Sequence, residues 1–427
     1  MIAAPVYRPA LPTKFHTNMP NNRKRFWITL CLLNLCIVAL FGFTLRSKIL
    51  FSIPFIDYRN ILNAHSHFGF TGWAGLSLIT LLVYDVLPQP LSQKPFYQWM
   101  LAATEVCALG MGVTFPIWGY TAPSIVFSSL YILVSFALTP VFIKDLLRSH
   151  IDKSVRLLSG ASLISLVLSA LGPMLLVYIM VSKSANAILY RNALYAFLHF
   201  QYNGFFTLAV LALFLNQVTK KGIALNKPAR LFALLLCLSV VPSLALSMLW
   251  QSRAVLYVIA AIGCVLMLSS LFYFFRWMRS INSKTLFSDS LARLLWTLAL
   301  FSFGLKTVLN AGTIIPALGD AVYGDRPVII GFLHLVFLGF ISFYILAMLA
   351  EHGYFKKLGK TVTYPFVVFG SGIIANEVLL MLQGLGNLLN MTTAFFNWLL
   401  WGAAILLLAG AVLLAVARFR SSNNAVS

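Results

Sequence analysis

Charged residues are scarce in this sequence. Only 10% of its 427 residues are Asp, Glu, Lys or Arg, whereas soluble domains carry about 25%. No stretch is both polar enough and long enough to suggest a water-soluble domain. Instead, 60% of the residues are hydrophobic. They gather in about a dozen runs that are too long for the core helices of a soluble protein. This composition indicates a membrane protein.

Cysteine and acidic residues are rare as well. The five cysteines all fall inside apolar runs, so we expect no disulfide framework. Only 10 residues are acidic, against 31 that are Lys or Arg, and the net charge is +21. A charge this positive could point to nucleic acid, but the basic residues lie in the loops between the apolar runs. We therefore expect a lipid bilayer as partner, and no nucleic acid.

The apolar runs divide into segments long enough to cross a bilayer. Lipid offers no hydrogen bonds, so every backbone amide in such a segment must bond within the protein, and helices satisfy this requirement. We expect twelve helices, at residues 26–46, 62–87, 96–118, 121–145, 155–181, 190–217, 229–250, 253–276, 291–312, 328–350, 363–384 and 394–417.

Lys and Arg are divided unequally between the loops on the two sides of the membrane. When the N-terminus is placed in the cytoplasm, the cytoplasmic loops and termini hold most of them. The positive-inside rule then places both termini in the cytoplasm. The prediction is an all-α membrane protein with a cytoplasmic arm (residues 1–25), a single transmembrane bundle (26–417) and a cytoplasmic tail (418–427).

Four of the seven histidines share a depth in the membrane. His65 and His67 stand in the second segment, His199 in the sixth and His334 in the tenth, and these three segments run in the same direction. Their positions place them roughly 5–14 Å below the outer edge. A histidine inside a membrane is costly, and imidazole binds iron and copper well. The pattern predicts a metal cofactor, above all haem. The alternative is that these histidines only hydrogen-bond to neighbouring helices.

The second segment offers one metal ligand rather than two. His65 and His67 point about 200° apart on a helix, so they cannot bind one metal together. Gly69 and Gly72 lie within about 40° of the direction of His65. They leave room for a flat macrocycle, or they let another helix pack closely. We expect His65 and His334 to face a common cavity and to bind one haem, and His67 to be structural or interfacial.

Three short motifs carry a resemblance to a known family. Twelve helices with histidines on the second, sixth and tenth resemble the catalytic subunit of haem–copper oxidases and nitric oxide reductases. His65, in Ala-His-Ser, lies where that family has a ligand of the low-spin haem. His-Phe-Gln-Tyr-Asn-Gly, starting at His199, is similar to the motif that binds the non-haem metal, with Asn203 in place of glutamate. His-Leu-Val-Phe-Leu-Gly-Phe-Ile, starting at His334, is also similar to NnrS-type membrane haem proteins.

The sequence departs from this family at two places. The seventh segment lacks the family's histidine pair, and the tenth offers one histidine where the family has two. The resemblance therefore implies a degenerate relative with one haem and no complete binuclear site. Copper or non-haem iron could bind at His199 with Asn203.

The resemblance also implies a setting for the protein. It implies oxidoreductase-type chemistry, either electron transfer or the handling of a small gas. It further implies a bacterial inner membrane, and as partners other membrane subunits or a quinol or cytochrome electron donor. Whether the chain is an enzyme, which haem it takes, its substrate and its oligomeric state stay open.

Three ionisable residues fall within predicted spans: Glu105, Lys306 and Glu377. An unpaired ammonium in the hydrocarbon region costs about 2.5–3.5 kcal/mol, so Lys306 needs a partner. Glu377 matches its depth, which predicts an ion pair, and a haem propionate is the alternative partner. Glu105 is either a neutral acid or part of a proton path. In a different class of function, a multi-pass transporter or channel, the three residues would line a polar path. A third alternative is a scaffold subunit without haem.

Overall fold

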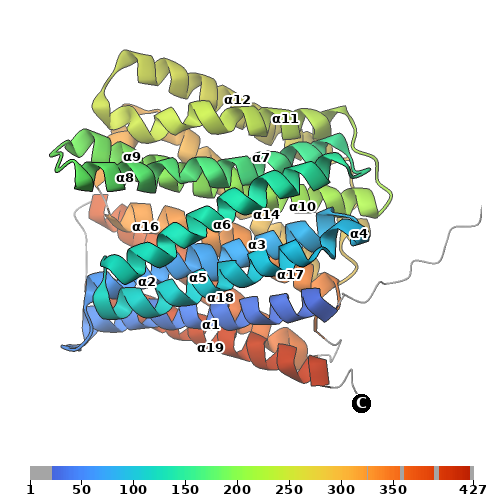
Figure 1. Ribbon diagram of the computed structural model, residues 1–427, viewed down its shortest axis with the longest axis horizontal. Helices are drawn as coiled ribbons and strands as arrows, with labels where there is room; N and C mark the ends of the chain where they lie inside the picture. Colours follow the sequence, from blue (N-terminus) through green and yellow to red (C-terminus); the bar gives the residue numbers. More distant parts are fainter. Residues whose placement is uncertain (1–21, 325, 356–359, 389–393, 424–427) are drawn as a thin grey trace, which may run out of the picture.

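Within the part of the chain that the structure describes, twelve helical segments are long and apolar enough to cross a membrane. The computed structural model describes residues 22–324, 326–355, 360–388 and 394–423, and within these ranges it contains no strand. The segments pack side by side in one bundle (Figure 1). The predicted all-α membrane fold with twelve spans is therefore confirmed, and each predicted segment coincides with one of the observed ones.

Several spans consist of consecutive helical elements, and short helices lie between some of them. In chain order the elements are α1 (Asn22–Leu50); α2, η1, α3 and η2 (Tyr58–Phe68, Gly69–Gly75, Leu76–Leu81, Leu82–Val86); α4 (Gln89–Ser92); α5 (Pro95–Trp118); α6 (Ala122–Leu147); α7 and α8 (Lys153–Ser169, Leu171–Val181); α9, η3 and α10 (Ala187–His199, Phe200–Phe206, Thr207–Lys220); α11 and η4 (Lys227–Ser243, Leu244–Gln251); α12 (Ala254–Met278); α13 (Ser283–Leu286); α14 (Ser290–Gly312); α15 (Pro316–Gly324); α16, η5 and α17 (Arg326–His334, Leu335–Ser342, Phe343–Glu351); α18 (Lys360–Leu388); and α19 (Phe395–Asn423).

Short polar side chains in the loops mark where several helices begin. Asp57 accepts a hydrogen bond of 2.9 Å from the backbone N–H of Asn60 and so caps α2. Asp289 does the same for α14, accepting from the N–H groups of Leu291 and Ala292. Such caps satisfy amides that have no partner within the helix. The few acidic residues of this chain are thus used partly to start membrane helices.

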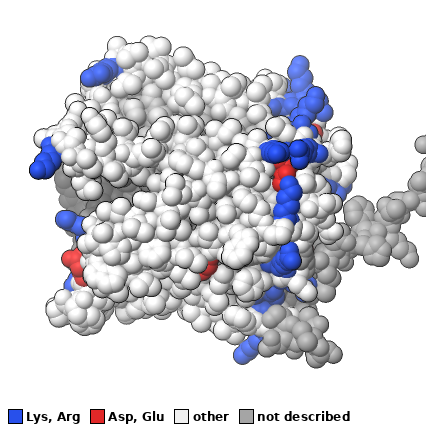
Figure 2. Space-filling model, in the orientation of Figure 1, with Lys and Arg blue, Asp and Glu red and all other residues white. Residues whose placement is uncertain are grey.

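Both described ends of the chain lie at the same end of the bundle (Figure 1). α1 begins at Asn22 and α19 ends at Asn423, so helix extends into both the predicted arm and the predicted tail. Residues 1–21 of the arm and 424–427 of the tail lie outside the described residues. On the face shown in Figure 2, Lys and Arg side chains concentrate at this same end. We call it the basic end.

The three spans that carry the histidine layer share an irregular geometry. Each changes to a π-helix close to its histidine: η1 begins four residues after His65, and η3 and η5 begin directly after His199 and His334. A π-helix is rare, and where it occurs it is often found at a functional site. The second and sixth spans are also the two most buried of the twelve. Of the four histidines on these irregular helices, His199 is buried, whereas His65, His67 and His334 are half-buried.

Candidate cofactor-binding site

His65 of α2 and His334 of α16 meet inside the bundle. The centroids of their imidazole rings are 6.3 Å apart, and the ring planes differ by only 21°. Both side chains line one cavity with a volume of about 240 Å³. Residues far apart in the sequence are thus brought together at one cavity, as expected from the sequence.

Backbone carbonyls hold each imidazole in one orientation. The Nδ1–H of His65 donates to the carbonyl oxygen of Val38 at 3.0 Å, and that of His334 donates to Ile330 at 2.8 Å. A carbonyl can only accept, so Nδ1 carries the proton and the Nε2 lone pair remains available in each neutral ring. Within the described part of the chain, neither Nε2 makes a hydrogen bond. Histidines that bind metals through Nε2 are typically held in this way.

The spacing of the two rings matches that of two imidazoles bound to one metal. An imidazole nitrogen binds a metal at about 2.0–2.1 Å, so two nitrogens on opposite sides of it are about 4 Å apart. With about 1.2 Å from each nitrogen to its ring centre, the centroids come to about 6.4 Å. The observed separation is 6.3 Å. The ring centres already have the spacing that such a metal requires.

The wall of the cavity is mostly apolar. Besides the two histidines, four polar or charged residues interrupt it: Arg46, Tyr58, Ser66 and Asn376. The remaining lining comes from α1, α2, η1, α16, η5, α18 and α19, and includes Leu35, Val38, Leu62, Phe70, Trp73, Phe337, Leu338, Phe369 and Leu407. An apolar pocket with a few placed polar groups is typical of a cofactor site. Arg46, Tyr58 and Asn376 were not predicted as site residues.

Glycines create part of the space, but not in the pattern predicted. Gly42 and Gly69 line the cavity, and a Cβ at Gly42 would lie 3.1 Å from Cε1 of His65. Gly72 is not part of the lining. A Cβ there would meet Phe68 and Ala108, so it permits close packing against α5. The cause is η1, which begins at Gly69: its wider turn changes the direction of each following residue relative to an α-helix.

No known protein family and no curated protein matches this chain. Among the described residues, no three His, Cys, Asp or Glu side chains gather to hold a metal ion. A haem iron needs fewer protein ligands, because the porphyrin supplies four and the protein only the axial ones. Two near-parallel imidazoles that line one mostly apolar cavity could provide such a pair of ligands.

His67 has a different role from His65. Its Nε2 shares a hydrogen bond of 2.6 Å with the hydroxyl of Tyr120, and its ring stacks on Phe115 at a centroid distance of 4.5 Å. Its contacts tie α2 to the end of α5 and to the loop that follows. The side chain does not line the cavity of His65. These contacts are those of a structural residue.

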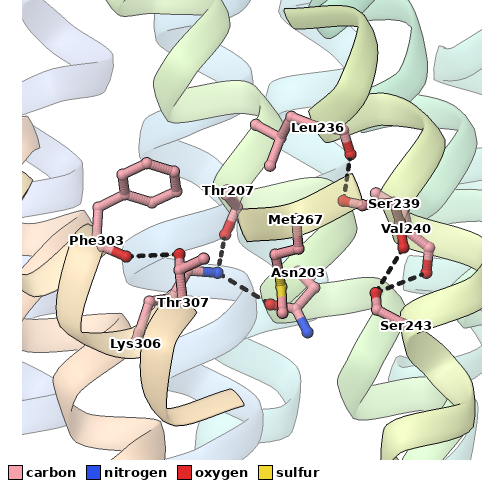
Figure 3. A pocket seen from close by; sticks show the side chains of 10 residues that line it. All are labelled: Asn203, Thr207, Leu236, Ser239, Val240, Ser243, Met267, Phe303, Lys306 and Thr307. Atoms are coloured by element: carbon pink, nitrogen blue, oxygen red, sulfur yellow. Dashed lines mark hydrogen bonds between the residues drawn. The ribbon is translucent and has the colours of Figure 1, made fainter. Parts of the chain in front are cut away.

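His199 belongs to a separate buried network with Asn203 and Lys306. Its Nε2–H donates to the carbonyl of Val240 at 2.7 Å, so Nδ1 is the acceptor in the neutral ring, facing the Asn203 amide nitrogen at 3.3 Å. The Lys306 ammonium donates to Asn203 Oδ1 at 2.9 Å and to Thr207 Oγ1 at 2.8 Å. Figure 3 shows Lys306 reaching Asn203 and Thr207 at a small cavity of about 10 Å³. In this arrangement both ring nitrogens of His199 are engaged in hydrogen bonds.

An aromatic cluster closes the side of the histidine cavity that faces η3. Phe70 and Phe337 line the cavity, and Phe206 of η3 packs against both. The ring centroids are 4.6 Å apart for Phe70 and Phe337, and 5.0 Å for Phe206 and Phe337. These side chains occupy the space between the paired histidines and the network of His199.

The predicted ion pair between Lys306 and Glu377 is wrong. Lys306 bonds to Asn203 and Thr207, whereas Glu377 Oε1 accepts a hydrogen bond of 3.1 Å from Asn376. The reason is packing: α14 lies chiefly against α17, η5 and α12, and α18 lies chiefly against α19 and α16. Lys306 and Glu377 were matched by depth in the membrane, but α14 and α18 pack mainly against other helices.

Glu105 lies in a third, separate contact. Its Oε2 accepts a hydrogen bond of 2.7 Å from Asn34, which also donates to the carbonyl of Gly72 at 2.9 Å. Its Oε1 is buried without a partner. Of the two cavities described here, Lys306 lines one, and neither Glu105 nor Glu377 lines either. These contacts favour separate structural roles over a shared polar path.

The Lys306 network predicts an unusual pattern of stability. Asn203→Leu removes an acceptor from a buried ammonium and should lower the free energy of unfolding by roughly 2–3 kcal/mol. Lys306→Met removes the charge, so the double variant should be more stable than Asn203→Leu alone. Thermal unfolding in detergent measures both differences. If the double variant lost as much stability as Asn203→Leu and Lys306→Met lose together as single variants, the network would be contradicted.

Proposed function

We propose that this chain is a haem-binding membrane protein in which His65 and His334 are the axial ligands of one iron. The observation that carries the proposal is the 6.3 Å separation of two near-parallel imidazoles across a shared cavity. Histidine is a common axial ligand of haem. The mostly apolar wall suits the faces of a porphyrin, which bury apolar surface when they leave water.

The residues of the cavity would each have a defined part in holding the group. The carbonyls of Val38 and Ile330 accept hydrogen bonds from Nδ1–H and so orient the imidazoles. The same bonds make each imidazole a stronger ligand for a metal through Nε2. A haem held by two histidines carries one electron at a time. Because both axial positions are filled by the protein, we propose electron transfer rather than binding of a substrate at the iron.

The orientation in the membrane follows from the distribution of charge. We propose that the basic end faces the cytoplasm, as the positive-inside rule favours, in the inner membrane of a bacterium. The cavity lies along the second half of α1, between Leu35 and Ile49. It is therefore nearer to the opposite side, where a quinol or a cytochrome could exchange electrons with it.

An absorption spectrum of the purified protein in detergent tests the proposal. We expect a reduced-minus-oxidised difference spectrum with the sharp bands of a six-coordinate, low-spin haem. Extraction of the pigment should give one haem per chain. Protein that is well folded and colourless after expression with ample haem would contradict the proposal.

We expect no rapid reduction of oxygen by this chain alone. The two cavity histidines would fill both axial positions, and the nitrogens of His199 are both engaged in hydrogen bonds. A metal held by one imidazole and an amide would also bind weakly, because too few ligands replace its water. Oxygen consumption in the presence of a chemical reductant measures this, and turnover like that of a true oxidase would refute it.

A further inference from the structure

Arg46 is a charged residue in the wall of the histidine cavity. It lines the cavity together with His65 and His334. Within the described residues its guanidinium makes no hydrogen bond and no ion pair. A guanidinium offers five N–H donors in a planar fork, and leaving them unmet beside an apolar wall is unfavourable. An anion bound in the cavity would provide acceptors for these donors.

The polar neighbours of Arg46 on α1 are satisfied, which sets it apart. Ser47 Oγ accepts a hydrogen bond of 3.0 Å from the indole of Trp401. The ammonium of Lys48 donates to the carbonyl of Ile53. Arg46 instead lines the cavity, and Tyr58 also contributes to its wall.

The position of Arg46 relative to the paired imidazoles suits one edge of a flat group between them. Val38, Gly42 and Arg46 are four residues apart and so share one face of α1. Val38 binds the His65 ring and Gly42 underlies it. Arg46 is one further turn along, about 6 Å away from Gly42, toward the end of the bundle opposite the basic end.

We propose that Arg46 binds a carboxylate of the cavity's ligand, and so orients the ligand with its acidic edge away from the basic end. This inference rests on the proposed function, in which the ligand is haem and the carboxylates are its propionates. Arginine matches a carboxylate with two parallel N–H···O bonds. The site thereby selects a macrocycle that carries acidic groups on one edge. It disfavours the orientation in which this edge faces the basic end.

Reconstitution with two macrocycles tests the proposal. Apo-protein is loaded with iron protoporphyrin IX or with its dimethyl ester, and the rate of haem transfer to an excess of apo-globin is measured. Arg46→Gln should speed the loss of the free acid about ten-fold, the effect of losing one charged hydrogen bond. It should leave the loss of the ester unchanged, and Arg46→Lys should recover part of the retention of the free acid.

Arg59→Gln is the matched control, because Arg59 is exposed at the same end of the membrane and does not line the cavity. It should change neither rate. Equal losses of both macrocycles from Arg46→Gln would overturn the proposal by making Arg46 a purely structural residue. No effect on either macrocycle would also overturn it, and would leave a lipid headgroup as the partner of Arg46. Wild-type protein that takes up neither macrocycle would refute the proposed function itself.

Discussion

Purified protein carrying His65→Ala or His334→Ala should lack the haem spectrum of the wild type. Each change removes one of the two imidazoles that line the cavity and would leave the iron with a single protein ligand. Loss of an outer hydrogen bond to a metal-binding histidine already weakens binding about 10–100-fold, and loss of the ligand itself should cost more than that. Absorbance of the haem relative to that of the protein measures the effect.

His67→Ala is the control for both variants. It removes an imidazole two residues from His65, yet His67 bonds to Tyr120 and does not line the cavity. It should keep its haem, although it loses stability because α2 is no longer tied to that loop. If His67→Ala loses its haem absorbance while His65→Ala keeps it, the assignment of the ligands is wrong.

Filling the cavity at Gly42 should also displace the haem while both histidines remain. A Cβ at Gly42 would lie 3.1 Å from Cε1 of His65, so alanine forces a small shift of the ring. Leucine would occupy the cavity itself, and overpacking of this kind costs about 1–3 kcal/mol. We expect Gly42→Ala to shift the spectrum slightly and Gly42→Leu to weaken haem binding roughly ten-fold. Titration of the apo-variants with haem measures the difference.

Gly402 offers a matched position for the same substitution. It lies in α19, and a Cβ there would have no neighbour within 4 Å. Gly402→Leu should therefore bind haem as the wild type does. Equal haem affinity of Gly42→Leu and Gly402→Leu would contradict the placement of the cofactor beside α1.

The fold and one part of the candidate site could be predicted from the sequence. A bilayer demands long apolar helices, so the twelve spans follow from composition and length alone. Depth in the membrane follows from position in a span, and this brought His65 and His334 to one level. Their meeting in one cavity also needed the right neighbours, which the sequence does not specify.

Equal depth in the membrane did not predict the partner of Lys306, because the packing of the helices decides which side chains meet. Lys306 and Glu377 lie on helices that pack mainly against other partners, and Lys306 finds its acceptors on Asn203 and Thr207. The π-helical turns were also invisible, because no residue pattern marks them. One of these turns directed Gly72 away from the cavity.

Arg46 was overlooked for a related reason. Near the end of a span, an arginine is normally counted with the loop, since its long side chain can reach water. Only the structure places it in the wall of the cavity. A charged residue on the same helical face as the contacts to a predicted ligand, here Val38 and Gly42, is the pattern that could have identified it.

The electron paramagnetic resonance spectrum of the oxidised protein tests directly whether His65 and His334 hold one haem iron. The imidazole planes of His65 and His334 differ by 21°. Near-parallel planes on a ferric haem give a rhombic low-spin spectrum, and perpendicular planes give a strongly axial one. We predict the rhombic spectrum, and its loss in His65→Ala and in His334→Ala. A high-spin spectrum, or no haem iron in folded protein, would contradict the account.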